Sequence, residues 1–199
     1  MDKILETAKR VDEFMMERSP IHDTMRRLAK TFEEMGIPFA IAGAMAANAH
    51  GHRRTTADVG ILIRRNDLLK FKEHWIGRGW IDLFDGSKGF KDTLNSVKVD
   101  VLIVGDYPGD GKVKPVSFPA PELVLEIHNE GLPFLNLPSL LELKIASGMT
   151  AAHRPRDLDD AIQLIRVNGL SRDYSNRLNP FVRERFVELW QAAQISEDY

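Results

Sequence analysis

The sequence predicts an α+β protein in which a mixed β-sheet is flanked by helices and followed by a C-terminal helical subdomain. Short runs of Val, Ile and Ala alternate with amphipathic stretches up to about residue 137, as expected for a sheet covered by helices. From Pro138 onward the apolar residues recur at helical spacing only. The 199 residues, 43% of them hydrophobic, are enough to bury one substantial core.

This change of pattern divides the chain into three segments. They are a helical lead-in at 1–37, a mixed α/β core at 38–137 and a helical segment at 138–199. The pattern fits either one compact protein or two tightly packed subdomains.

The lead-in contains two amphipathic helices. Apolar residues recur at helical spacing over 4–15 and again over 25–35. Pro20 separates the two stripes, and Gly36 followed by Pro38 ends the second.

Strands and helices alternate through the core, and helices alone follow it. Turn residues fill 82–90, and the Gly- and Pro-rich stretch 106–122 is expected to be a loop with at most a short edge strand. The other expected elements are strands at 38–43, within 53–63 (where a basic, hydroxyl-rich loop leads into a strand with Asp58 at its head) and 97–105, and helices at 44–51, 66–80 (Asn66 as N-cap), 138–149, 156–169 and 179–193 (Asn179 as N-cap).

The composition is that of an ordinary globular protein. A formal net charge of −2 does not require a polyanionic partner, and the absence of cysteine excludes disulfides and thiolate metal sites. The N-terminal stretch is amphipathic and carries acids, without the apolar centre of a signal peptide. No apolar run approaches the length that spans a membrane, so we expect a cytoplasmic protein without membrane contact.

Three segments place glycine or a charge where packing alone would not favour it. Gly43 lies at a strand-to-helix turn in IAGAMAANAHG, where backbone N–H groups can cradle a phosphate. Asp58 begins the strand of RRTTADVGILI, and Gly60 interrupts that strand on the same face. Asp100 lies inside the valine-rich strand VKVDVLIV, where a carboxylate must be paired, exposed at an edge or bound to a metal.

In order and spacing, these segments resemble the nucleotidyltransferase superfamily, in particular its AbiEii-like and minimal nucleotidyltransferase branch. That branch carries a Gly-Gly or Gly-Ser turn, then Arg-x-Thr-x-Asp-x-Asp on a strand, a single Asp on a later strand, and a helical Leu-Lys followed by Arg-x-Lys-Asp-x-x-Asp. The corresponding residues run from Gly43 and Ala44 (in place of the second Gly or Ser) through Arg54, Thr56, Asp58 and Asp100 to Lys144, Arg154, Arg156 (in place of Lys), Asp157 and Asp160.

The resemblance implies transfer of a nucleoside monophosphate from an NTP to an acceptor hydroxyl. Asp58 and Asp100 would be ligands of Mg²⁺ (or Mn²⁺), and Lys144 and Asp157 would be further catalytic residues. The acceptor would be RNA, with tRNA as the first choice, and a toxin of this branch would have a cognate antitoxin. The residues that would bind the nucleotide are Gly43, Ala44, Arg54, Thr56, Lys144 and Arg154.

Gly60 departs from this pattern, because the family has the second Asp of Asp-x-Asp there. The family's three acids hold two divalent ions, roughly 3.5–4 Å apart. Without the bridging carboxylate the two-metal arrangement should be impaired, and activity as well. Three hypotheses follow: a nucleotidyltransferase whose metal site has been disabled, a pseudo-enzyme that binds nucleotide or RNA without turnover, or an antitoxin-like module that binds a partner.

Several of these residues also have simple structural interpretations. Asp157 follows Pro155 and fits a helix cap, with Asp160 favouring the helix dipole in the first turn. Lys144 would extend past apolar surface to water, and Arg154 and Arg156 would be surface charges. The six histidines show no metal-binding spacing, and His50 and His52 are expected in a solvent-facing loop.

Overall fold

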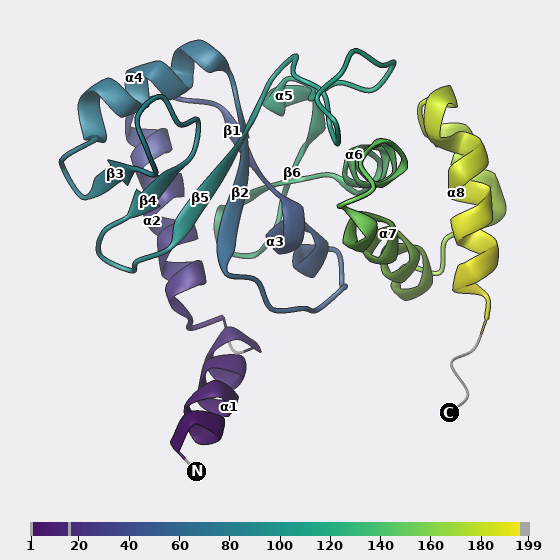
Figure 1. The fold of residues 1–199 in the computed structure, drawn as a ribbon, viewed down its shortest axis with the longest axis horizontal. Coiled ribbons are helices and arrows are strands. Elements are labelled where there is room, and N and C mark those ends of the chain that lie inside the picture. Colours follow the sequence, from purple (N-terminus) through teal and green to yellow (C-terminus); the bar gives the residue numbers. More distant parts are fainter. Residues whose placement is uncertain (1, 16, 196–199) are drawn as a thin grey trace.

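One mixed β-sheet organises the protein (Figure 1). The computed structural model describes residues 2–15 and 17–195. Among these residues seven strands pair in the order β3-β4-β5-β2-β1-β7-β6. The strands are β1 (Phe39–Ala42), β2 (Asp58–Ile63), β3 (Trp80–Asp82), β4 (Phe90–Asp92), β5 (Lys98–Ile103), β6 (Leu125–Ile127) and β7 (Pro133–Leu135).

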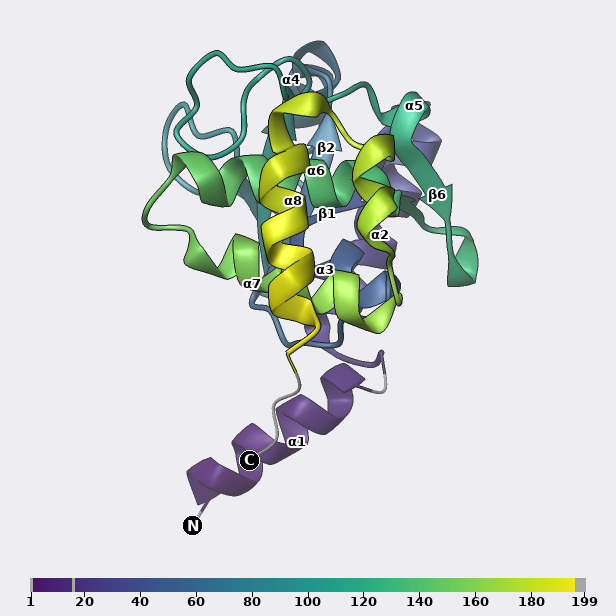
Figure 2. The same ribbon diagram turned by 90° about the vertical axis from the view of Figure 1, so that its right-hand side faces the viewer.

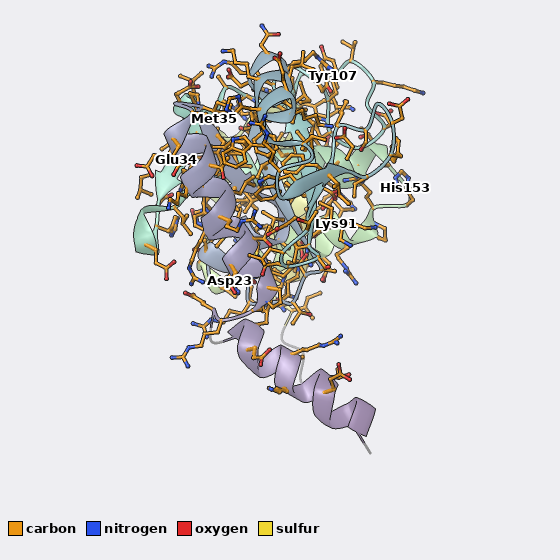
Figure 3. All side chains as sticks on the ribbon, turned by 90° about the vertical axis from the view of Figure 1, so that its left-hand side faces the viewer. Asp23, Glu34, Met35, Lys91, Tyr107 and His153 are labelled. Atoms are coloured by element: carbon orange, nitrogen blue, oxygen red, sulfur yellow. The ribbon has the colours of Figure 1, made fainter. Side chains whose placement is uncertain are left out.

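Helices cover both sides of this sheet. Helices α2 and α4 lie on one side, whereas α6, α7 and α8 lie on the other (Figures 1 and 2). Helix α1 extends away from the body, and α2 runs along the near face in Figure 3, from the region of Asp23 to Glu34. The helices are α1 (Asp2–Met15), α2 (Pro20–Glu34), α3 (Gly43–Ala49), α4 (Arg65–Trp75), α5 (Pro121–Val124), α6 (Leu137–Thr150), α7 (Pro155–Val167) and α8 (Pro180–Ala193), with 3-10 turns η1 (Asn129–Gly131) and η2 (Arg172–Arg177).

The central strands confirm the expected alternation of side chains. β2 is antiparallel to β1 and parallel to β5, so Gly60 lies between Ala42 and Asp100. Residues in register on parallel neighbours point to one face of the sheet, as do residues two apart on one strand. Asp58, Gly60 and Asp100 therefore share a face.

Aromatic rings fill the core between the sheet and the α2 and α4 layer. Phe71 of α4 contacts Phe32 of α2, at 5.1 Å between ring centroids, and also Trp80 and Phe90, at 5.7 and 4.7 Å. All four side chains are fully buried. This apolar layer leaves the opposite face of the central strands available for polar side chains.

The structure corrects several predicted elements. The helix expected over 66–80 ends at Trp75, because Trp80 already belongs to β3, and Arg64 rather than Asn66 occupies the N-cap position. The structure describes every residue of 106–122 and shows no strand there. Pro121, near the end of this stretch, begins α5. β3, β4, β6 and β7 were not predicted, because three residues are too few to show alternation. The three-segment division of the chain stays a prediction.

None of the helices in the described ranges is both long and apolar enough to cross a membrane. Asn179 does cap α8, as predicted, since its side-chain oxygen accepts a hydrogen bond from the Phe181 N–H.

A buried carboxylate joins α2 to the β3–β4 edge. The Asp92 side chain is 0% exposed and accepts hydrogen bonds from Thr24 Oγ1 at 2.9 Å and Asn95 Nδ2 at 2.8 Å. Arg27 of α2 forms an ion pair with it. Burial favours the neutral acid, but these donors and the Arg27 charge outweigh it and lower the pKa of Asp92 below 3.8.

Thr24→Val tests this junction. We expect it to lower the free energy of unfolding by about 1–3 kcal/mol, because a buried ionised carboxylate loses one of its donors. Urea unfolding measures the change. Thr55→Val, at an exposed threonine, is the control, and an equal loss in both variants would contradict the role of Asp92.

Candidate functional site

A cleft of about 1040 Å³ opens on the polar face of the central strands. Asp58, Gly60 and Asp100 line one wall, and Lys144 of α6 and Arg154 lie among the residues of the cleft. The residues predicted as a site from five separate stretches of the sequence therefore line a single cavity. The volume of this cavity leaves room for a ligand much larger than a metal ion.

Asp58 and Asp100 lie diagonally to each other on one face of the β2–β5 pair, because Asp100 is in register with Gly60, two residues after Asp58. Thr56 Oγ1 donates a hydrogen bond to Asp58 Oδ1 at 2.6 Å, which orients that carboxylate. Partial withdrawal from bulk water raises the pKa of Asp100 above 3.8, and the charge and hydrogen bond of Asp58 raise it further. Two neighbouring carboxylates that repel each other at an open cleft favour the binding of a cation between them.

The pair fits a divalent cation such as Mg²⁺. Mg²⁺ is normally held by one or two carboxylates, with water and substrate phosphates completing its octahedron. Asp58 and Asp100 supply that number of carboxylates, and the cleft has room for the other ligands. A second ion lacks the carboxylate that would bridge it to the first, because Gly60 has no side chain.

Gly60 lies close to the end of β1. A Cβ atom at this position would be 3.2 Å from the Ala42 carbonyl oxygen and 3.6 Å from the Gly43 nitrogen. Any larger residue therefore requires the β1–α3 turn to shift by a few tenths of an ångström. The backbone at this point is packed around a glycine.

The β1–α3 turn lies beside the two acids. Gly43 has a φ of +65°, a conformation that glycine adopts without strain, and it begins the seven-residue helix α3. Gly43 and Ala44 both line the cleft. The structure thus places the predicted phosphate-binding turn next to the predicted metal ligands.

Lys144 belongs to a buried ion-pair network centred on Asp160. Its ammonium contacts the Asp160 carboxylate and lies 3.3 Å from Asp157 Oδ1. Arg54 donates a hydrogen bond from its terminal nitrogen to Asp160 Oδ2 at 2.9 Å. His52 Nε2 lies 3.2 Å from Asp160 Oδ1.

This network connects α6, α7 and the loop that precedes β2. Burial would raise the pKa of Asp160, but the Lys144 ammonium and the Arg54 guanidinium outweigh burial and lower it below 3.8. Asn48 also holds the loop, since it accepts a bond from the Arg54 N–H at 2.7 Å and donates one to the Arg54 carbonyl at 2.9 Å. The loop that leads into Asp58 is therefore held by Asn48 through the Arg54 backbone and by Asp160 through the Arg54 side chain.

Several predictions for this region need correction. Lys144 does not extend to water: it is 5% exposed and paired. Arg154, not Asp157, is the N-cap residue of α7, and the acid in the first turn is Asp157, whereas Asp160 lies beyond that turn and is fully buried. His52 is not solvent-facing, because its side chain is 15% exposed and contacts Asp160.

Ser147 is a site residue that the sequence analysis missed. Its hydroxyl donates a hydrogen bond to Asp157 Oδ2 at 2.7 Å, and it lines the cleft. Ser147 follows Lys144 by three residues, as Asp160 follows Asp157, so each pair shares a helix face. That matched spacing on two neighbouring helices is the signal that could have indicated the contact.

Arg154 and Arg156 are exposed and line the cleft. An Arg154 terminal nitrogen lies 3.9 Å from Asp157 Oδ2, and the Arg154 charge acts on Asp100, opposing the rise in its pKa. These two guanidinium groups give the rim a positive charge opposite the Asp58–Asp100 wall.

Known structures share this fold. No protein family matches the sequence, and no curated protein does either. The structure is similar to the crystal structure of the aminoglycoside nucleotidyltransferase ANT(2″)-Ia in complex with adenylyl-2″-tobramycin, with a TM-score of 0.51, 8% identity, and coverage of 87% of this chain and 98% of that one. It also matches a solution structure of the same enzyme, described as an antibiotic-resistance factor, with a TM-score of 0.48, 13% identity, and coverage of 85% and 90%.

The similarity confirms the predicted fold class. The protein has the mixed α+β architecture of a nucleotidyltransferase, with helices around a mixed sheet. At 8% identity the likeness shows the fold alone.

Asp160→Asn tests the buried network. We expect it to lower the free energy of unfolding by about 3–5 kcal/mol, because Lys144 is left as a buried cation with a neutral partner. Since the pKa of Asp160 is lowered on folding, its contribution is present above about pH 4 and is lost as the pH falls through the folded-state value. Urea unfolding at several pH values measures both effects. The exposed neighbour provides the control Asp159→Asn, which should change stability by less than about 0.5 kcal/mol.

Asp100→Asn tests the repulsion between Asp100 and Asp58. Because folding raises the pKa of Asp100, the folded state binds more protons than the unfolded state above about pH 4, and stability falls as the pH rises through this window. With EDTA present, the variant should therefore be more stable than the parent at pH 7, by less than about 1 kcal/mol, and equally stable near pH 3. Asp85→Asn, at an exposed acid, is the control. A less stable Asp100→Asn at pH 7 would contradict the repulsion.

Proposed function

We propose that this protein is a nucleotidyltransferase-fold protein that binds an NTP with a divalent cation, and that its parent activity is transfer of the nucleoside monophosphate to an acceptor hydroxyl. One observation carries the proposal. Asp58 and Asp100 share one face of adjacent parallel strands, two residues out of register, beside a glycine-led helix start, at the wall of a cleft large enough for a nucleotide. The fold is that of an enzyme class with this chemistry.

Asp58 and Asp100 would hold Mg²⁺ (or Mn²⁺). A bound ion would neutralise phosphate charge and lower the pKa of an acceptor hydroxyl. Thr56 keeps the Asp58 carboxylate oriented toward the cleft through its 2.6 Å hydrogen bond. The raised pKa of Asp100 means that cation binding and protonation compete for this acid, so affinity for the ion should increase with pH.

The nucleotide phosphates would lie between the β1–α3 turn and the positive rim. The backbone N–H groups of Gly43 and Ala44 can donate to phosphate oxygens. Arg154 and Arg156 are exposed at the cleft and supply positive charge, whereas the charge of Lys144 is balanced by Asp157 and Asp160. Lys144 would thus contact phosphate from within a paired cluster, with Asp157 as its orienting acid.

Arg54 and Thr56 would contribute mainly by positioning. Arg54 lines the cleft but is bound to Asp160, and it connects the loop before β2 to α7. Arg54 and Thr56 would thus support Asp58 as well as bind the nucleotide.

Gly60 would impair the activity of the protein as it stands. If the reaction requires two ions, the loss of several kcal/mol of transition-state stabilisation makes turnover undetectable. The intact remainder of the cleft favours an enzyme with a disabled metal site. A non-catalytic protein that binds nucleotide or RNA is the second hypothesis, and an antitoxin-like module that binds a partner is the third.

The acceptor is proposed from the sequence resemblance. The AbiEii-like branch favours RNA, with tRNA first, a toxin-like role and a cognate antitoxin. The structure of ANT(2″)-Ia contains bound adenylyl-2″-tobramycin, which makes a small polyhydroxylated amine the alternative acceptor to test. The positive charge of Arg154 and Arg156 at the rim would attract the phosphates of RNA, whereas it would repel the ammonium groups of such an amine.

Gly60→Asp provides the decisive comparison, with Gly60→Ala as the matched control. Both variants add the Cβ atom beside the Ala42 carbonyl oxygen, so both disturb the β1–α3 turn equally, but only aspartate adds the carboxylate. With each α-labelled NTP, Mg²⁺ or Mn²⁺, and total RNA or tobramycin, we expect label transfer by Gly60→Asp at a rate at least about a hundredfold above the parent and Gly60→Ala.

A measurement of NTP binding separates the three hypotheses. NTP binding by the parent chain, measured by equilibrium dialysis with Mg²⁺, is expected and should be lost in Asp58→Asn. Binding without transfer in any variant would favour the pseudo-enzyme. If neither NTP binding nor label transfer is observed, both nucleotide-based hypotheses are overturned.

A further inference from the structure

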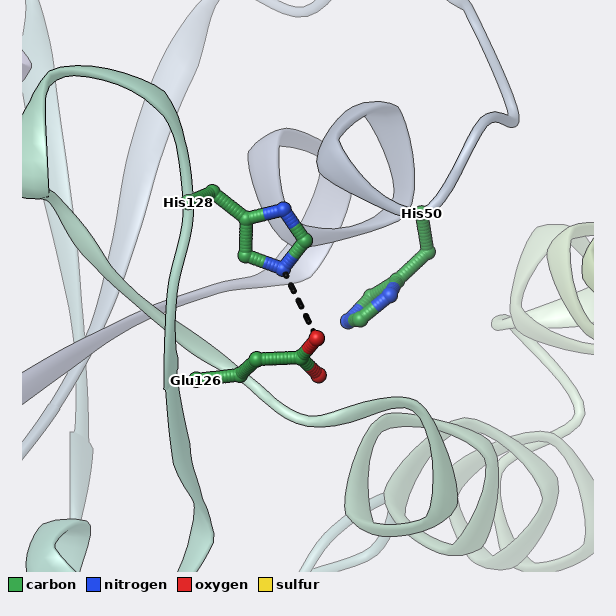
Figure 4. A group of neighbouring side chains, drawn as sticks. All are labelled: His50, Glu126 and His128. Carbon is green, nitrogen blue, oxygen red and sulfur yellow. Dashed lines mark ion pairs between the residues drawn. The ribbon is translucent and has the colours of Figure 1, made fainter.

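A second group of metal-ligating side chains lies away from the cleft. His50, Glu126 and His128 each direct one ligand atom to a common point, and these atoms lie within 4.8 Å of one another (Figure 4). His50 directly follows α3, whereas Glu126 belongs to the edge strand β6 and His128 follows that strand. The cluster contains no residue of the nucleotide cleft.

His128 has an unsatisfied nitrogen in this cluster. Its Nε2 atom is shielded from solvent and has no hydrogen-bond partner among the described residues. The nearest charged oxygen, Glu126 Oε1, lies 3.8 Å away, beyond hydrogen-bond length. A buried polar atom without a partner requires an explanation, and an ion between the two side chains provides one.

The separations fit a shared metal. Two ligands bound to tetrahedral Zn²⁺ at about 2.1 Å are about 3.4 Å apart. The His128–Glu126 separation of 3.8 Å is close to this value, and the widest separation allowed in the cluster, 4.8 Å, would close by about 1.4 Å through side-chain rotation.

The His50 ring is already held beside the other two side chains. Its Nε2 atom lies 2.7 Å from the Leu135 carbonyl oxygen, and its centroid is 5.1 Å from that of His128, with the rings perpendicular. An ion bound at Nε2 would replace the contact with Leu135.

We propose that His50, Glu126 and His128 form a binding site for a transition-metal ion, with Zn²⁺ as its preferred class. Two imidazoles and one carboxylate suit Zn²⁺, whereas Mg²⁺ and Ca²⁺ prefer oxygen ligands alone. The Glu126 side chain is 53% exposed, so a fourth coordination position is open to water. The ion would join the end of α3 to the β6 edge of the sheet.

Calorimetric titration of the full chain with Zn²⁺ tests the site. Excess Mg²⁺ in the buffer occupies carboxylate-only positions such as the Asp58–Asp100 pair. We expect one Zn²⁺ per chain in the parent protein, and an affinity at least about tenfold weaker in Glu126→Gln and in His128→Gln. Zn²⁺ at a hundred times its Kd should raise the Tm of the parent by roughly 5–10 °C.

Matched variants distinguish this site from other zinc ligands. His74→Gln removes an exposed histidine of α4, and Asp58→Asn removes an acid of the cleft. Both should bind Zn²⁺ with the affinity of the parent. Because Glu126 is exposed, Glu126→Gln should fold even if His128→Gln does not. The proposal is overturned if the parent does not bind Zn²⁺, if Glu126→Gln binds as tightly as the parent, or if Asp58→Asn alone loses the ion.

Discussion

The carboxylate of Asp160 is withdrawn completely from water, and a charge in that position is tolerated only because cations surround it. Those cations come from segments far apart in the chain: Lys144 on α6 and Arg54 on the loop before β2. These contacts hold α7 to α6 and to the loop before β2, all three of which line the cleft. The same loop leads directly into Asp58, so the network that joins the helices to the loop also helps to position this proposed metal ligand.

Glycine at position 60 leaves the rest of the cleft intact. The register of β1, β2 and β5 places residue 60 between the β1–α3 turn and Asp100, where a carboxylate could bridge two ions. The strands do not need that carboxylate, because their buried face is filled by apolar side chains such as Val59 and Ile61. The sheet can therefore form without the acid that the proposed two-ion reaction would need.

Helix α3 connects the two proposed ligand sites. It begins at Gly43, beside the nucleotide cleft, and ends at Ala49, just before His50. A helix of seven residues is about 10 Å long, so an ion at the histidine end would restrain an element whose other end lines the proposed nucleotide cleft. The two sites use different chemistry, since the cleft offers carboxylates alone and the second cluster offers imidazoles as well.

The sequence by itself determined the central strands and the shared face of Asp58, Gly60 and Asp100, because the two-residue alternation of a strand is a local property of the backbone. It also indicated the fold class. Only the tertiary structure decided what Lys144 and His52 contact and that two histidines meet a glutamate. His52 and Asp160 are 108 residues apart, and their contact depends on how helices pack against the sheet. Strands of three residues, such as β7, likewise acquire their place only by pairing with a neighbour, because so few residues carry no periodicity of their own.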